Sequence, residues 1–250
     1  MIKPWLCAST AAAAWLLVSA FLAPAAAADL SVAPIYKAPM AVVPNWTGAY
    51  VGVAGGGAWG SAVVRSDVTG VDQAPRIDLE GGIIGVTAGF NVQNGPAVVG
   101  FEADTSAVAK RGSAFEFPPN GAFSNEVRER WLSTFRGRVG YAQDNWLFYA
   151  TAGAAVADVH HLIQGPTASI GQSQWHWGLT AGGGVEVKLN PDWTAKVEYL
   201  YVGLQDKSYF NPAPTPGFPS NQRLNLDEHI VRVGVNYKLP WSVLDPFFKR

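Results

Sequence analysis

The chain has little that could crosslink it or bind a metal. Its 250 residues contain one cysteine, Cys7, which lies in an N-terminal segment that we expect to be removed. The remaining chain would then have no thiol for a disulfide or a cysteine-ligated metal. We therefore expect neither metal nor cofactor.

Charge is also scarce, with Asp, Glu, Lys and Arg making up 15% of the residues. A typical soluble domain carries roughly 25%. Without Lys3, 17 basic residues face 19 acidic ones, and this near balance gives no indication of nucleic-acid binding.

The first 28 residues have the pattern of a secretory signal peptide. Lys3 is the only charge before Asp29, an apolar run follows it, and the run ends in Ala25-Ala26-Ala27-Ala28. A basic tip, an apolar core and small residues at the end predict export and cleavage near Ala28. The alternative, a retained anchor, lacks the flank that such an anchor needs.

Past residue 28 no apolar stretch is long enough for a membrane helix. Residues 29–45 carry prolines at regular intervals and predict an extended periplasmic linker. If the rest crosses a membrane, it must do so as strands.

After this linker, eight segments of alternating polarity predict β-strands, and short and long connections alternate strictly between them. The expected strands are 46–60, 80–93, 97–108, 128–142, 146–159, 173–189, 193–206 and 227–239. Long, polar connections lie at 61–79, 109–127, 160–172 and 207–226, and the three short ones at 94–96, 143–145 and 190–192 are rich in turn residues. This order is typical of an outer-membrane barrel, with short periplasmic turns and longer outer loops.

Each strand has one apolar and one ionic face, because side chains alternate across a strand. In a membrane barrel the ionic face points inward, where charges persist only when they are paired. The expected interior charges nearly cancel and predict a salt-bridge network, with a gated ion path as the alternative: Glu102, Asp104, Arg136, Arg138, Glu186, Lys188, Lys196, Glu198, Glu228, Arg232 and Lys238.

Aromatic residues at both strand ends indicate that the apolar face is the outer one. Such belts mark the two interfaces between water and lipid, whereas a soluble barrel would bury its apolar face. One expected belt lies near the short turns or the termini, with Trp46, Tyr141, Trp146, Trp193 and Tyr237, and the other near the long loops, with Trp59, Trp131, Trp175, Trp177 and Tyr201.

Together these features predict an all-β fold, an eight-stranded antiparallel up-and-down transmembrane β-barrel. It would comprise a signal peptide (1–28), a linker (29–45), the barrel (46–239) and a C-terminal tail (240–250). Lipid offers no hydrogen bonds to a sheet edge, so the first strand must pair with the last.

Several stretches resemble one family. ADLSVAPIYKAP, NWTGAYVGVAGGGAWG, GGIIGVTAGFNVQNG, STFRGRVGYAQDNWLFYATAGAAVA and the ending VRVGVNYKL are similar to the small outer-membrane barrels of alphaproteobacteria, the 25/31-kilodalton surface antigens, which are related in fold to the transmembrane domain of outer-membrane protein A. The resemblance covers nearly the whole mature chain. It implies an eight-stranded barrel with a structural, surface-antigen or porin-like role.

The chain departs from this family at its end. Members usually finish on an aromatic residue that the barrel-assembly machinery is thought to read, whereas Leu239 stands there in this chain. Tyr237, or Phe247 and Phe248 in the tail, are the candidates to replace it.

Catalytic motifs are absent or misleading. Gly55–Gly60 matches a dinucleotide-binding glycine pattern, but no helix is expected to follow it. Ser173 and His176 are a conceivable hydrolase pair without a third group to orient the histidine. We therefore expect no enzyme.

The sequence favours a structural surface protein of the bacterial outer membrane, in contact with membrane lipids, lipopolysaccharide and, during insertion, the barrel-assembly machinery. The alternatives are a weak porin-like channel, a haem or adhesin receptor and, least favoured, a lipid A-modifying enzyme. The receptor would use loop residues Phe115, Phe117, Phe123, His160, His161, Tyr209 and Phe210.

Overall fold

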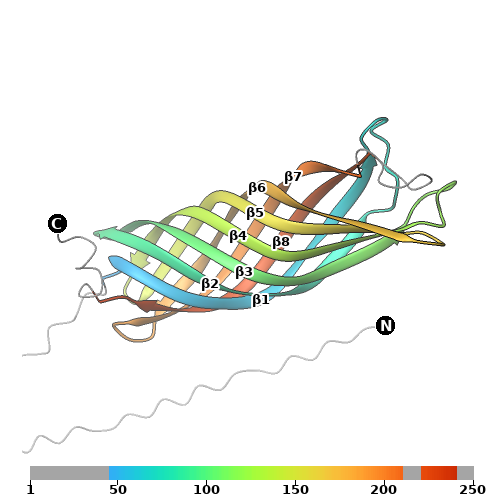
Figure 1. Cartoon of the computed structure of the whole chain (residues 1–250). Helices are drawn as coiled ribbons and strands as arrows, with labels where there is room; N and C mark the ends of the chain where they lie inside the picture. Colours follow the sequence, from blue (N-terminus) through green and yellow to red (C-terminus); the bar gives the residue numbers. More distant parts are fainter. Residues whose placement is uncertain (1–44, 211–220, 241–250) are drawn as a thin grey trace, which may run out of the picture. The chain divides into compact units, whose positions relative to one another are not determined.

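A computed structural model describes residues 45–210 and 221–240, which form one closed β-barrel (Figure 1). Neighbouring strands are antiparallel throughout and follow the order of the chain. The strands are β1 (Gly48–Ser66), β2 (Ile77–Asn94), β3 (Ala97–Phe115), β4 (Ser124–Gln143), β5 (Trp146–Gln164), β6 (Ser169–Lys188), β7 (Trp193–Tyr209) and β8 (Gln222–Lys238).

The first and last strands close the barrel as expected. β1 pairs with β8 from Tyr50 opposite Lys238 to Ser66 opposite Gln222. This long register joins the first strand to the last, which a sheet surrounded by hydrocarbon requires because its backbone groups cannot bond to the solvent. Toward the loop end the closure is incomplete, since β6 pairs with β7 only from Gly178 to Lys188. The expected eight-stranded, up-and-down topology is confirmed.

The three short turns follow from local chemistry. Gly95 and Asp144 adopt the left-handed conformation, with φ of 59° and 51°, which glycine and aspartate tolerate better than most residues. In the third turn, Asn190 Oδ1 accepts hydrogen bonds from the backbone N–H groups of Asp192 and Trp193 at 3.0 and 2.9 Å. These three turns define one end of the barrel, called here the turn end.

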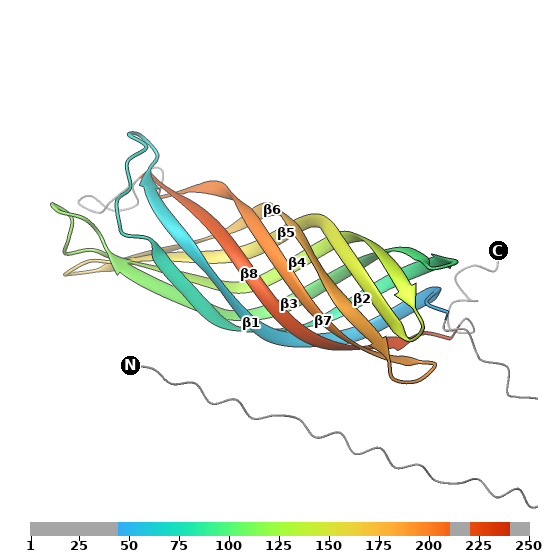
Figure 2. The same ribbon diagram turned by 180° about the vertical axis from the view of Figure 1, so that it is seen from behind.

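At the other end, the loop end, the strands are longer than the sequence led us to expect. The connections there shorten to 67–76, 116–123, 165–168 and 210–221. Figures 1 and 2 show the β1–β2, β3–β4 and β5–β6 connections reaching out together at this end. The expected loops were too long at both ends, because the projecting strands carry polar residues on their outer face and so resemble loops in sequence.

Two further findings concern the extent of the described chain. Within residues 45–210 and 221–240, no helix is long and apolar enough to cross a membrane. Apart from Asn45 and Pro240, the expected signal peptide, linker and tail, with Phe247 and Phe248, lie outside the described residues.

The interior is layered in a way that the sequence analysis did not anticipate. Ionic side chains fill the half near the turn end, whereas a large apolar cluster fills much of the half near the loop end. Leu132, Leu200 and Ile230 begin this apolar layer, each less than 3% exposed. On the inner face of a strand, the side chains thus change from ionic near the turn end to aliphatic near the loop end.

Glycines on the inner face make room for these side chains. Gly89 lies directly opposite Tyr50 in the β1–β2 register, and a Cβ at Gly89 would come within 2.4 Å of the Tyr50 ring. The tyrosine can therefore cross the lumen toward the ionic residues only because residue 89 has no side chain.

We predict that Gly89→Ala lowers the free energy of unfolding by about 1–3 kcal/mol, the usual cost of overpacking a dense interior. Gly57→Ala is the matched control, because nothing lies within 4 Å of a Cβ there. Urea titrations of the barrel refolded into lipid vesicles measure both. Equal midpoints for the two variants would refute the packing explanation.

Candidate functional site

The candidate site is the ionic network across the lumen near the turn end, called here the lumen network. Its members are Glu102 and Asp104 on β3, Arg136 and Arg138 on β4, Glu186 on β6, Lys196 and Glu198 on β7, and Arg232 on β8, all buried. Their contacts join strands that are not neighbours, such as β3 and β7. These contacts therefore run through the interior rather than along the wall.

Arg136 is the centre of the lumen network. Its guanidinium contacts Glu102 Oε1 at 2.6 Å, Asp104 Oδ2 at 2.7 Å and Glu198 Oε1 at 3.0 Å. It is fully buried, and one planar group with five donors can serve three carboxylates at once. Arg136 thus links three of the four acidic members.

Two other cations complete the pairing of these carboxylates. Arg232 Nε donates to Glu198 Oε2 at 2.7 Å, and its terminal nitrogens donate to Asp104 at 3.1 Å. Lys196 Nζ contacts both oxygens of Glu102, at 2.9 and 2.7 Å. Each of these carboxylates therefore touches at least two cations.

Arg138 forms a second part of the network with Glu186, to which it donates a short hydrogen bond. Its guanidinium carbon lies 3.6 Å from the centre of the Tyr149 ring. Tyr50 accepts from Arg138 at 3.3 Å and donates to Glu102 Oε2 at 2.9 Å. Tyr50 thereby connects the two parts.

The lumen network is neutral as a whole, since its four cations match its four anions. Buried charges persist when they are paired and fully hydrogen-bonded. Polar neighbours add further contacts: Thr134 donates to Asp104 Oδ2 at 2.6 Å, and Asn236 donates to Glu186 Oε1 at 2.8 Å. Within the described residues, the buried Nε groups of Arg136 and Arg138 have no hydrogen-bond partner. The charged groups of the lumen network are thus engaged with one another rather than directed toward a substrate.

Glu228 belongs to a different group, although it was expected in this network. It lies beyond the first apolar residues with Lys110 and Glu129, and Lys110 Nζ contacts the two carboxylates at 2.6 and 2.7 Å. All three side chains are at most 1% exposed. Two carboxyl groups therefore share one ammonium group in a layer that is otherwise largely apolar.

Lys110 and Glu129 were not expected in the interior, for separate reasons. Lys110 continues the inward alternation of Asp104, Ser106 and Val108 but was assigned to a loop. Glu129 has the same parity as the outward Trp131, and only a register shift in β4 between these residues turns it inward. A bulge of this kind reverses the faces beyond it.

Lys188 and Lys238 also depart from the expected network. Both lie at the turn end and donate to the backbone carbonyl of Asn45, at 2.8 and 3.0 Å. Neither forms a salt bridge within the described part of the chain. They therefore hold the segment that enters β1 across this end of the barrel.

Trp46 is a correction to the expected aromatic belts. It is only 5% exposed and packs in a small apolar cluster with Val98, Leu147 and Tyr149. Lys188 Nζ lies 5.0 Å from the centre of its ring, within the range of a cation–π contact. Trp46 precedes the first strand, so the alternation of a strand did not apply to it.

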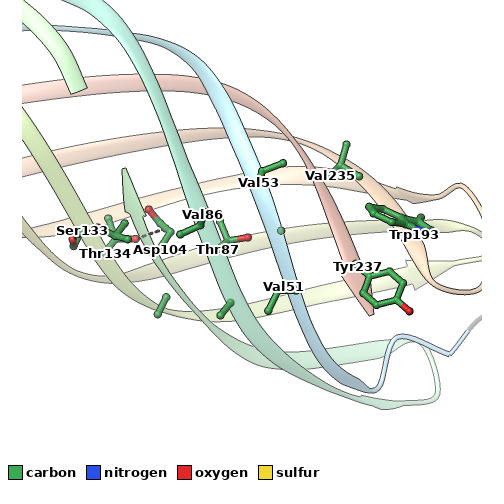
Figure 3. Close-up of a pocket in the computed structure, with 14 residues that line it drawn as sticks. Val51, Val53, Val86, Thr87, Asp104, Ser133, Thr134, Trp193, Val235 and Tyr237 are labelled. Carbon is green, nitrogen blue, oxygen red and sulfur yellow. Dashed lines mark hydrogen bonds between the residues drawn. The ribbon is translucent and has the colours of Figure 1, made fainter. Parts of the chain in front are cut away.

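The structure places the other expected belt residues on the outer surface, exposed or partly so, with Tyr237 packed on Trp193 at 5.1 Å between ring centres. Trp193 and Tyr237 also border a groove of about 800 Å³ on the outside of the barrel (Figure 3). Its walls include Val51, Val53 and Val86. Such an apolar groove suits contact with acyl chains.

The hydroxyls of Thr105 and Ser133, also in the wall of this groove, lie 2.9 Å apart and satisfy each other. Polar groups that face hydrocarbon need an internal partner of this kind. The groove therefore offers lipid an apolar surface without a free polar group from this pair.

Ser173 and His176 cannot act together, because they lie on opposite faces of β6. Ser173 is exposed, whereas His176 is fully buried and contacts the Tyr209 hydroxyl at 2.9 Å. Ser173 instead lies 2.9 Å from Nδ1 of His160 on the outer surface. The described residues hold no group of three His, Cys, Asp or Glu side chains placed to bind a metal.

The residues expected to form a loop receptor are also divided. Phe115 and Phe117 are exposed, but Tyr209, Phe210 and His161 are buried. His161 packs against Tyr209 and Phe210, each at 5.2 Å between ring centres. The two adjacent histidines do not converge, because successive residues of β5 point to opposite faces.

Near the loop end, His161 lies in a chain of buried polar groups. Its Nε2 is 2.8 Å from Asn125 Oδ1, and Asn125 donates to Glu116 Oε1 at 3.0 Å. Burial, followed by the neighbouring His160, lowers the pKa of His161 to about 3. Burial raises the pKa of Glu116, which has no cation among its hydrogen-bond partners.

Arg136→Ala should lower the free energy of unfolding by about 3–5 kcal/mol, because it leaves three buried carboxylates short of a cation. Arg65→Ala is the control, since Arg65 forms an exposed pair with Asp72 at 2.7 Å, and exposed pairs contribute little to stability. Urea unfolding in vesicles provides both values. An unchanged midpoint for Arg136→Ala would contradict the central role of this residue.

His161 also predicts a loss of stability in acid. The unfolded histidine binds a proton below about pH 6.5, whereas the folded one stays neutral until about pH 3. Stability should therefore fall by on the order of 2 kcal/mol between pH 6.5 and 4.5. Protonation of Glu116, whose pKa is raised, acts in the opposite direction.

The comparison of wild type with His161→Gln isolates the contribution of this histidine. The stability advantage of the wild type should shrink as the pH falls, and His160→Gln, at a partly exposed position, should leave most of that slope in place. A constant difference between wild type and His161→Gln across this range would show that His161 is not kept neutral.

Comparison with known proteins extends over nearly the whole chain. Residues 13–238 match the family model described as outer membrane protein beta-barrel domain. The 31 kDa outer-membrane immunogenic protein of Brucella melitensis biotype 1 is 30% identical over 237 residues, covering 89% of this chain and 96% of the relative. The 25 kDa outer-membrane immunogenic protein of Brucella canis is 31% identical over 221 residues, covering 87% and 92%.

Among solved structures, that of Neisserial surface protein A (NspA) matches with a TM-score of 0.43 and 15% identity, covering 77% of this chain and 98% of that one. The closed barrel has an apolar outer surface, and the family match extends over all eight of its strands. This chain therefore belongs to the outer membrane protein beta-barrel domain family, and it is an outer-membrane β-barrel protein related to immunogenic surface proteins.

Proposed function

We propose that this outer-membrane protein is a closed structural barrel that displays surface segments, and that it does not conduct solutes. The turn end would face the periplasm and the loop end the cell exterior, as in other barrels with short turns and longer loops. Its partners would be membrane lipids, lipopolysaccharide and, during insertion, the barrel-assembly machinery.

The filling of the lumen is the observation that carries this proposal. The lumen network crosses the interior near the turn end, and the apolar layer that begins with Leu132, Leu200 and Ile230 follows it. An eight-stranded barrel is just wide enough for its own side chains to fill. A hydrated ion would have to break a neutral ionic network and then enter an aliphatic layer.

The surface role is supported by the projecting strands and by the relatives. The names of the two Brucella proteins describe them as immunogenic. In this chain β3, β4, β5 and β6 extend past the outward tryptophans toward the loop end. Exposed side chains on these extensions would be the parts of the protein accessible from outside the cell.

The other functions considered have less support. A receptor that uses His160 and His161 together is disfavoured, because His161 is buried inside the barrel. A lipid A-modifying enzyme that uses Ser173 and His176 is disfavoured because the two side chains lie on opposite faces. The lumen network could still gate ions, and this alternative is the one that a conductance measurement decides.

We predict no stepwise conductance when the refolded barrel is inserted into planar lipid bilayers under an applied voltage. A variant with Leu132, Leu200 and Ile230 all changed to Ala thins the apolar layer and should leak more readily. Leu179→Ala, at an outward position that is 74% exposed, is the control for a change outside the lumen. Regular conductance steps from the wild type would refute a closed barrel.

A further inference from the structure

The outer face of β3–β6 near the loop end carries a group of basic side chains that the lumen does not explain. In the register, Arg111 lies directly opposite Arg128, Arg128 opposite His160, and His160 opposite Ser173. Arg130 follows Arg128 on the same outer surface, and all three arginines are exposed. Arg111, Arg128, Arg130 and His160 are called here the basic row.

Cationic side chains directly opposite each other on one sheet face normally destabilise the pairing. Arg111 forms no salt bridge within the described residues, although the exposed Glu80 lies opposite it on β2. Arg128 and Arg130 each contact one carboxylate, Glu126 at 2.6 Å and Asp158 at 2.7 Å, but remain 49% and 56% exposed. Each guanidinium therefore keeps donors that face outward.

The basic row is also held in place by its neighbours. Ser173 Oγ lies 2.9 Å from His160 Nδ1 and accepts from Arg130 at 3.3 Å. The imidazole lies over Gly171, where a Cβ would come within 2.8 Å of Nε2. Arg130, His160 and Ser173 thus form one connected group on the barrel wall.

The depth of the basic row matches the head-group region of a lipid leaflet. Asp158 is opposite both Trp131 and Trp175, two exposed tryptophans of the kind that mark a lipid interface. Arg128 and His160 lie two or three residues farther toward the loop end, a displacement of about 7–10 Å along a strand.

The opposite side of the barrel differs at this level. On β1 and β8, Arg65 and Arg223 are bound to Asp72 and Asp67. The exposed Tyr201 hydroxyl of β7 donates to Asp227 at 2.9 Å. On the side formed by β3, β4 and β5, by contrast, Arg111 has no bound carboxylate among the described residues and lies beside Arg128.

We propose that the basic row binds the phosphorylated head group of an outer-leaflet glycolipid. Guanidinium groups bind phosphate through two parallel hydrogen bonds, and Trp131 and Trp175 would contact the start of the acyl chains. A phosphate bound between Arg111 and Arg128 would reduce the electrostatic repulsion between these two side chains. This site rests on the proposed function, because it requires the loop end to face the outer leaflet.

The test uses the full mature chain, refolded in zwitterionic detergent, with purified lipopolysaccharide as the probe. Wild type should gain thermal stability with lipopolysaccharide, and the gain should decrease with enzymatically dephosphorylated material or added salt. The variant R111Q/R128Q/H160Q should bind about tenfold or more weakly, equivalent to about 1.4 kcal/mol. R65Q/R223Q, on the opposite side, should stay within about twofold of wild type.

Equal binding by both variants, or binding that ignores dephosphorylation, would overturn the site. Heat-modifiable gel migration reports whether each variant is folded. R111K/R128K keeps the positive charge but loses the paired hydrogen bonds of the guanidinium, and it should bind more tightly than the triple variant and more weakly than wild type. Membrane fractionation tests the proposed function separately. Failure of the barrel to pellet with the outer membrane would refute that function, whereas lost phosphate dependence in a correctly located barrel refutes only the lipid site.

Discussion

The constraint behind this structure is that a backbone surrounded by hydrocarbon must satisfy its own hydrogen bonds. Closure of β1 on β8 meets it and removes both sheet edges. The two-residue period of a strand then sends alternate side chains outward to lipid and inward to a narrow lumen. The residues that point inward are buried, so they are stable there when they pair with each other or are apolar. The lumen network and the apolar layer are these two solutions, and the apolar half also contains the paired Lys110, Glu129 and Glu228.

Most of the fold could be predicted from the sequence, because its signals are local. Turn residues, alternating polarity and the order of short and long connections identify eight strands and their direction. The inward position of Arg136, Glu102 and Glu198 follows from the same alternation. Their pairing does not, because Lys196 meets Glu102 across the lumen from 94 residues away, and only the curvature and stagger of the closed sheet bring such residues together.

The features that the sequence analysis missed have identifiable causes. Glu129 turns inward after a register shift that the pattern of residues does not reveal, and Lys110 lies in a strand extension whose polar outer face resembles a loop. Trp46 precedes the sheet and packs into its end instead of facing lipid. At bulges, strand extensions and the segment that enters the first strand, the alternation of side chains no longer predicts which face a residue occupies. In this protein these places determine which charged side chains lie together in the interior.

The strand extensions have a consequence for how antibodies would recognise this protein. A surface built from paired strands presents side chains from different parts of the chain next to each other, as Arg128 and His160 are across β4 and β5. An epitope on such a surface is discontinuous and exists only while the hairpins remain paired. Sera raised against the intact barrel would then react poorly with linear peptides from these segments, although the peptides contain every contacted residue.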